Sequence, residues 1–293
     1  MLGEVLTAVV TPFAADGSVD LDAFRRVCRH LVENGSDGVV VAGTTGEAPT
    51  LTDEERLTLF ATAVEAVGDR STVIAGTGTY STAHSADLTA QAHELGVDGF
   101  LVVTPYYSKP PVPGILAHFR AIAEETDRPI VVYNIPQRVV LNLEPDTIAL
   151  LAEIPNVRAV KQATPDPEQA RRIVDFGLDL YAGNDDLILP FLEVGGVGGI
   201  LVFTHLVGPQ VKEMIARFKR DDREGARAIE AELRPVIEAL AVTTNPIPLK
   251  AALAMVGQEV GGYRLPLVEP SEEERAKIRS GLERAGVLVA AQL

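Results

Sequence analysis

The sequence has almost no cysteine and few histidines. Cys28 is the only cysteine among 293 residues, so the chain forms no internal disulfide and no cysteine zinc cluster. We interpret Cys28, which lies in an apolar helical stripe, as a core residue rather than a redox thiol. The five histidines lack ligand spacing, such as two histidines four residues apart beside a glutamate. The sequence therefore predicts no metal and no other cofactor.

The sequence also lacks long apolar runs and an excess of positive charge. No stretch is long enough to cross a bilayer, and no basic segment followed by an apolar run opens the chain. We therefore expect neither a membrane protein nor a signal peptide, and the simplest compartment is the cytosol. The formal net charge of -15 argues against nucleic-acid binding, which needs a positive field.

Short apolar runs rich in β-branched residues recur along the chain at the spacing of strand–helix units. They lack alternation of polar and apolar residues, as expected of parallel strands buried on both faces. The eight predicted strands are Val5–Val10, Gly38–Val41, Thr72–Ala75, Gly99–Val103, Ile130–Tyr133, Val157–Val160, Leu178–Ala182 and Gly199–Phe203. This repetition predicts an α/β fold, a (β/α)8 TIM barrel, with a doubly wound open sheet as the alternative.

Local signals predict where several of the intervening helices begin and end. Gly35, Gly96 and Gly195 each precede a strand, where a left-handed glycine suits the end of a helix. Side chains suited to capping helix N-termini are Asp20, Thr52 with Glu55, and Asp166 with Pro167.

Beyond Pro209 the pattern becomes purely helical. The predicted helices are Pro209–Lys219, Asp222–Thr243, Ile247–Val256 and Ser271–Ala285. The first reads as the last barrel helix, and no Pro-, Gly- or Ser-rich linker follows it. We therefore predict a barrel with the catalytic site over residues 1–220 and a C-terminal helical extension over residues 221–293, packed on the barrel.

Lys161 is the most informative single residue. It follows an apolar run predicted to be a buried strand, in a chain where only six of the 26 basic residues are lysine. Burial favours the neutral amine, which can attack a carbonyl and form a Schiff base. The alternative is a strand-end lysine whose amine reaches solvent. The polar residues at neighbouring strand ends favour the nucleophile.

Those polar residues converge because the active site of such a barrel lies where the strands end. Tyr133 carries a phenol suited to moving protons, and Thr44 and Thr45 lie in a glycine-flanked turn that can hold a carboxylate. Arg138 can clamp a second carboxylate. Each has a structural alternative, namely a strand-end aromatic, a turn cap or a solvated charge. Their convergence on one rim favours catalysis.

Several motifs extend this pattern along nearly the whole chain. They are Gly43-Thr44-Thr45-Gly46-Glu47, Tyr106-Tyr107, Tyr133-Asn134-Ile135-Pro136, Lys161, Gly195–Ile200 and Asn245-Pro246-Ile247-Pro248-x-Lys250. Together they resemble the dihydrodipicolinate synthase / N-acetylneuraminate lyase superfamily of class I aldolases. The resemblance implies a lyase that condenses pyruvate with an aldehyde through a Schiff base.

Arg138, in the run Tyr-Asn-Ile-Pro-x-Arg, resembles the synthase branch of that superfamily. The resemblance implies that Lys161 forms an imine with pyruvate and that Tyr133 relays protons. It links Tyr133 to Thr44 and to Tyr107 of an adjacent subunit, in a homotetramer built as a dimer of dimers.

The same resemblance implies the substrate contacts. Thr45 would bind the pyruvate carboxylate and Arg138 the carboxylate of L-aspartate 4-semialdehyde, with Gly183 and Ile200 as further substrate-binding residues. The product would be 4-hydroxy-tetrahydrodipicolinate, an intermediate of lysine and diaminopimelate biosynthesis.

The sequence departs from the superfamily pattern at several positions. The departures are Gln162, Leu201, Thr204-His205 and Val139-Val140. They keep two alternatives open: a lyase or aldolase acting on a sugar acid or a 2-keto-3-deoxy acid, and a non-catalytic barrel that binds a small keto acid. Positions matching the superfamily's allosteric lysine site carry Asp53, Arg56, Tyr80 and His84, so we predict weak or absent inhibition by lysine.

Overall fold

The computed structural model describes residues 2–288 and contains eight parallel strands closed into one barrel. The strands are β1 (Val5–Ala8), β2 (Gly38–Val41), β3 (Thr72–Gly76), β4 (Gly99–Val103), β5 (Ile130–Asn134), β6 (Val157–Gln162), β7 (Asp179–Ala182) and β8 (Gly198–Leu201). Each pairs with the next along the chain, and β8 pairs with β1, so the sheet has no open edge. The predicted barrel is confirmed, and the open-sheet alternative is wrong.

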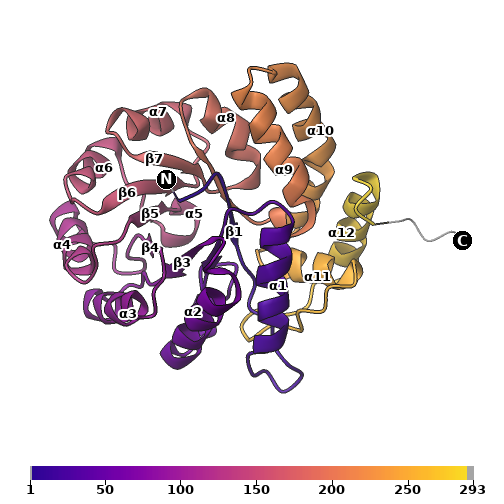
Figure 1. Cartoon of the computed structure of the whole chain (residues 1–293), viewed down its shortest axis with the longest axis horizontal. Coiled ribbons are helices and arrows are strands. Elements are labelled where there is room, and N and C mark those ends of the chain that lie inside the picture. Colours follow the sequence, from indigo (N-terminus) through magenta and orange to yellow (C-terminus); the bar gives the residue numbers. More distant parts are fainter. Residues whose placement is uncertain (1, 289–293) are drawn as a thin grey trace, which may run out of the picture.

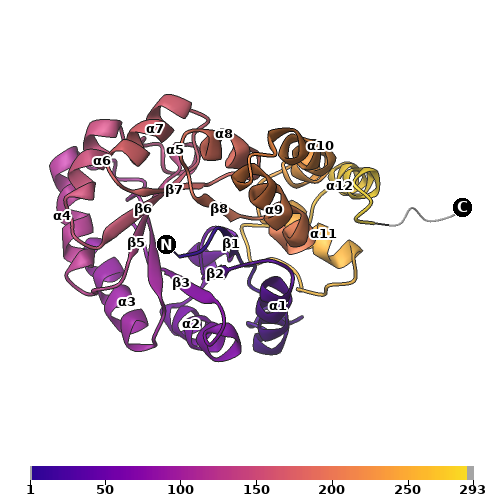
Figure 2. The same ribbon diagram turned by 45° about the horizontal axis from the view of Figure 1, so that its top comes forward.

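Helices form an outer ring around the strands (Figure 1). They are α1 (Leu21–Glu33), α2 (Asp53–Val67), α3 (Thr82–Glu94), α4 (Val112–Ala123), α5 (Pro136–Val139), α6 (Pro145–Ala152), α7 (Pro167–Asp175), α8 (Ile188–Glu193), α9 (Thr204–Lys219), α10 (Arg223–Leu240), α11 (Ile247–Met255) and α12 (Glu272–Arg284). Figure 2 shows that α10, α11 and α12 lie outside the ring, beside α9 and α1. No helix within residues 2–288 is both long and apolar enough to cross a membrane.

The side chains of each strand alternate between two apolar cores. One core lies between the strands and the helices, and it includes Val132 and Val160. The other fills the barrel interior and includes Val131, Tyr133 and Ala159. This alternation points every second side chain of a strand toward the barrel axis.

The local helix signals are confirmed. Asp20, Thr52, Asp166 and Ser271 all accept a backbone N–H as N-caps, and Thr52 with Glu55 forms the predicted capping box. The three helix-ending glycines, Gly35, Gly96 and Gly195, all have left-handed φ angles of +96°, +82° and +100°.

Several predicted boundaries are wrong by a few residues. β1 and β8 end two residues earlier than expected, whereas β6 continues through Lys161 to Gln162. α9 begins at Thr204 rather than Pro209, because two helical pieces meet at a kink around Val207. A proline suits the first turn of a helix, which is why the sequence pattern indicated a start at Pro209. The predicted boundary between residues 220 and 221 falls between α9 and α10 and stays a prediction.

Candidate active site

Lys161 and Tyr133 face the same space inside the barrel. They lie opposite each other on β6 and β5 in the parallel register, and both are buried, with 4% and 5% of their surface exposed. The Lys161 Nζ atom is 4.3 Å from the centre of the Tyr133 ring. The amine of Lys161 is therefore enclosed rather than exposed at the end of a strand.

Burial lowers the pKa of Lys161 to about 7. The charge of Asp185 opposes this shift, and the charge of Arg138 adds to it. A lysine with this pKa has a large neutral fraction at neutral pH, so it can act as a nucleophile without a separate base to deprotonate it.

Asp185 is the carboxylate whose charge acts against the lowered pKa of Lys161. Its carboxylate accepts the backbone N–H groups of Val202 at 2.9 Å and Phe203 at 3.0 Å, just after β8. Burial raises the pKa of Asp185 to about 6, while the two N–H groups and Lys161 oppose the rise. Asp185 is therefore a residue of the site for which the sequence analysis predicted no role.

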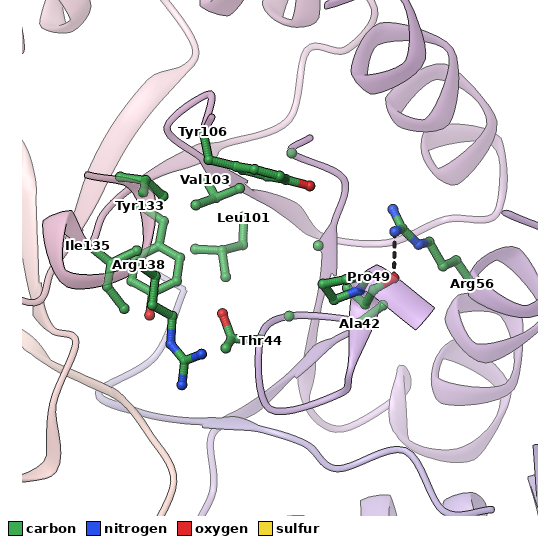
Figure 3. A pocket seen from close by; sticks show the side chains of 15 residues that line it. Ala42, Thr44, Pro49, Arg56, Leu101, Val103, Tyr106, Tyr133, Ile135 and Arg138 are labelled. Atoms are coloured by element: carbon green, nitrogen blue, oxygen red, sulfur yellow. Dashed lines mark hydrogen bonds between the residues drawn. The ribbon is translucent and has the colours of Figure 1, made fainter. Parts of the chain in front are cut away.

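Tyr133 lines a pocket at the carboxyl ends of the strands. The cavity has a volume of about 230 Å³, and Thr44, Tyr106 and Arg138 line it too. Figure 3 shows Tyr133 and Arg138 on one side of this pocket, with Arg56 on the opposite side. The predicted proton relay and carboxylate clamp therefore share one cavity.

Burial also raises the pKa of Tyr133 to about 12, against the opposing charge of Arg138 and a hydrogen bond with the Thr44 side chain. The phenol therefore stays protonated at neutral pH, in the form that can donate a proton. We expected Lys161, Tyr133 and Thr44 to line one pocket wall. Tyr133 and Thr44 line the cavity, but Lys161 does not. The amine lies against the Tyr133 ring instead.

Thr45 and Arg138 are both held by the segment that precedes α11. The Asn245 Nδ2 group donates to Thr45 Oγ1 at 3.0 Å, and Thr45 is buried. The exposed Arg138 donates through Nη2 to the Asn245 carbonyl oxygen at 3.1 Å and to Thr244 Oγ1 at 3.3 Å. Asn245 has no predicted role, although it begins one of the motifs that carry the family resemblance.

The remaining predicted site residues differ in position. Tyr107 is 94% exposed with a φ of +71°, and it is not among the residues that line the pocket. Ile200 is fully buried in the barrel interior. Gly183 uses its N–H to bond the Gln162 carbonyl at 2.8 Å, and a Cβ there would lie 2.8 Å from the same oxygen. Only the carbonyl of Gly183 is thus left for a substrate.

Two of the sequence departures have a structural explanation. Gln162 is buried on the outer side of β6, where its Oε1 accepts from Asn134 and its Nε2 donates to Gln169, each at 2.9 Å. An acidic side chain would disturb this neutral amide network. His205 bonds the Val202 carbonyl through Nδ1 at 2.8 Å, and burial lowers its pKa to about 4. Both departures therefore lie in packing contacts.

The other two departures lie in different parts of the structure. Val139 lines the pocket, whereas Leu201 packs in the core between strands and helices. Within residues 2–288 no three His, Cys, Asp or Glu side chains are grouped to hold a metal ion. The expected absence of a cofactor stays a prediction.

Comparisons with known proteins cover nearly the whole chain. The Dihydrodipicolinate synthetase family matches residues 1–285. A 4-hydroxy-tetrahydrodipicolinate synthase of Moorella thermoacetica is 50% identical over 291 residues, which cover 98% of this chain and 99% of the relative.

Solved structures give the same result. A crystal structure from Cyanidioschyzon merolae, described as DHDPS with lysine bound, has a TM-score of 0.96 and 43% identity, over 98% of this chain and 99% of that one. A chloride-inhibited dihydrodipicolinate synthase from Acinetobacter baumannii, complexed with pyruvate, has a TM-score of 0.95 and 34% identity, over 98% and 100%.

Proposed function

This chain belongs to the dihydrodipicolinate synthetase family and is a lyase with 4-hydroxy-tetrahydrodipicolinate synthase activity, and we propose that it works through a Schiff base between Lys161 and pyruvate. The observation that carries this proposal is the buried Lys161 amine, 4.3 Å from the centre of the Tyr133 ring. The activity places the chain in lysine and diaminopimelate biosynthesis. This activity argues against the two alternatives that the sequence left open, an aldolase acting on a sugar acid or a 2-keto-3-deoxy acid and a non-catalytic barrel.

In the proposed reaction the neutral Lys161 amine attacks the pyruvate carbonyl carbon. The carbinolamine loses water to give the imine, and the Tyr133 phenol supplies and recovers the protons that these steps require. Loss of a proton from the pyruvate methyl group gives an enamine. The enamine forms a carbon–carbon bond to the aldehyde of L-aspartate 4-semialdehyde, and attack of that substrate's amino group on the imine carbon releases Lys161.

The carboxylates of the two substrates need separate partners. Thr45, in the turn after β2, is our proposed donor to the pyruvate carboxylate, and Gly183 and Ile200 shape the same subsite. Arg138, at the exposed side of the pocket, is the proposed partner for the carboxylate of the aldehyde.

Tyr107 requires a second subunit in this proposal. Its side chain is 94% exposed and held at a φ of +71°, which is unfavourable for a bulky residue. We propose that it enters the Tyr133–Thr44 relay of an adjacent subunit, within a homotetramer built as a dimer of dimers. A cytosolic location is also proposed, and cell fractionation tests it.

Reductive trapping tests the Schiff base directly. With pyruvate and borohydride, we expect a mass increase on the tryptic peptide that contains Lys161, and none in Lys161→Ala. Lys212→Ala is a matched control, because Lys212 is paired with Asp37 in another part of the fold. An unmodified Lys161 in active enzyme would contradict the proposal.

A further inference from the structure

The motif Asn245-Pro246-Ile247-Pro248-x-Lys250 has no assigned part in the reaction. It lies at the start of α11, in the C-terminal extension, yet both of its polar ends reach the turn after β2. That turn carries Thr44 and Thr45. The two contacts join residues that are 200 and 203 positions apart in the chain.

One contact is a buried ion pair. The Lys250 Nζ atom lies 2.5 Å from Glu47 Oε1, and both side chains have no exposed surface. Lys250 also donates to the Gly262 carbonyl at 2.8 Å and packs 4.3 Å from the centre of the Phe13 ring. Two buried charges with these extra partners hold a fixed geometry.

Glu47 connects the ion pair to the turn, because its own backbone is part of the turn. Its backbone N–H donates to the Thr44 carbonyl at 3.1 Å, and its φ of +57° is left-handed, a conformation that a non-glycine residue keeps only when its surroundings impose it. Thr11 donates to the Gly46 carbonyl at 2.7 Å from the other side. Contacts from Lys250 and Thr11 therefore hold two adjacent residues of the turn, Glu47 and Gly46.

The other contact sets the direction of a hydroxyl group. Thr45 Oγ1 accepts a hydrogen bond from Asn245 Nδ2 at 3.0 Å. A hydroxyl has one proton to donate, so an Oγ1 that accepts here keeps its own proton free for another partner. An anionic carboxylate is the partner that such a free donor favours.

We propose that Asn245 and Lys250 are positioning residues for pyruvate: Asn245 directs the Thr45 hydroxyl proton toward the pyruvate carboxylate, and Lys250, through Glu47, holds the turn that carries Thr44 and Thr45. The inference rests on the proposed function of Thr45. It makes the C-terminal extension a part of the substrate site, although none of its residues lines the pocket.

Steady-state kinetics of Asn245→Ala test the proposal. We expect the KM for pyruvate to rise about 10- to 100-fold, the usual worth of one hydrogen bond to a charged group, with a smaller change in kcat. The KM for the aldehyde should change little, because alanine keeps the backbone carbonyl that binds Arg138. A folded variant with an unchanged pyruvate KM overturns the role of Asn245.

Asn245→Asp separates positioning from simple loss of packing. An ionised aspartate only accepts hydrogen bonds, so it accepts one from the Thr45 hydroxyl group and repels the pyruvate carboxylate. Its pyruvate KM should therefore exceed that of Asn245→Ala. An equal or lower value would contradict the role given to the Thr45 hydroxyl.

The ion pair is tested by the double variant Lys250→Met with Glu47→Gln, because removing both charges avoids leaving one of them buried alone. We expect a raised pyruvate KM here too, and wild-type kinetics would overturn the role of Lys250. Lys277→Met is the control, since it breaks the exposed pair with Glu273 and should leave both KM values unchanged.

Borohydride trapping distinguishes this inference from the proposed function. If both hold, Asn245→Ala needs more pyruvate than wild type for half-maximal trapping but reaches the same final modification of Lys161. Equal pyruvate requirements refute only the positioning role. Absence of any adduct in wild type refutes the Schiff base itself.

Discussion

At the scale of single residues, the proposed chemistry depends on one buried amine with a large neutral fraction at neutral pH. The pKa of Lys161 falls to about 7 because its ammonium form loses hydration inside the barrel. Asp185 limits the fall by stabilising the charged form. The same carboxylate can stabilise the positive charge that develops on the imine nitrogen after the amine has reacted.

The rate of imine trapping should therefore depend on pH around neutrality. The neutral amine is the attacking form, so the trapping rate should rise with pH, reach half of its maximum near the pKa of about 7 and level off above it. Cyanoborohydride trapping followed by mass spectrometry measures this profile. A rate that keeps rising toward the ordinary lysine value of 10.5 would show an unperturbed amine.

The variant Asp185→Asn should shift the midpoint of that pH profile in a direction that can be predicted. Removing the carboxylate takes away a charge that favours the ammonium form, so the midpoint should move to lower pH. A midpoint that moves to higher pH would exclude the electrostatic role of Asp185.

Tyr133→Phe tests the proton relay. We expect kcat to fall by roughly 10²- to 10⁴-fold, the usual contribution of a positioned acid–base group, while the fold persists because the ring remains. Tyr181→Phe is a matched control, since Tyr181 is also buried in the barrel but donates to the Gly3 carbonyl. Comparable losses of activity in both variants would argue against a relay at Tyr133.

At the scale of secondary-structure elements, α2 contributes Arg56 to the far side of the pocket, and contacts join α2 to α3. Asp53 and His84 join the two helices, with His84 Nε2 and Asp53 Oδ1 2.9 Å apart. Tyr80 and Tyr106 pack edge to face with ring centres 5.4 Å apart. Arg56, which is 7% exposed, places its guanidinium group along the same pocket. The positive charge on this side of the pocket is therefore that of Arg56 on α2.

This arrangement supports the prediction that lysine is a weak inhibitor or none. Free lysine has a net positive charge at neutral pH, and the positive charge of Arg56 disfavours binding of a cation at short range. Initial rates measured over a lysine titration, together with calorimetry for binding, test the prediction. Strong inhibition at sub-millimolar lysine would contradict it.

At the scale of the whole molecule, closure of the barrel brings the ends of all eight strands to one rim. The C-terminal extension, which lies outside the ring of helices, contacts that rim through hydrogen bonds from Asn245 to Thr45 and from Lys250 to Glu47. Tyr107 projects outward from the same rim and is exposed within one chain. The proposed site is therefore complete only when a second subunit supplies this phenol.

Subunit mixing tests that requirement. Tyr107→Phe and Lys161→Ala should each be nearly inactive alone, and refolding them together should restore activity in about a quarter of the sites, because a mixed pair has one site with both groups. No recovery in mixtures shown to exchange subunits would contradict sharing. Sedimentation of wild type tests the tetramer.

The sequence alone determined the features that local chemistry controls. The eight strands, the N-caps at Asp20 and Thr52 and the helix-ending glycines were predictable, because each depends on residues within a few positions. The pattern also indicated Lys161, Tyr133 and Arg138, because parallel strands must end at one rim. Boundaries were less accurate, as at Pro209, where a proline inside α9 resembles a helix start.

Only the tertiary structure decided the contacts between distant segments. The pKa of Lys161 depends on enclosure by the barrel and on the charge of Asp185, and neither can be read from its neighbours in sequence. The contact of Asn245 with Thr45 spans 200 positions and exists only because the extension packs against the rim. Local patterns specify elements, whereas desolvation and hydrogen-bond partners depend on how the closed barrel brings those elements together.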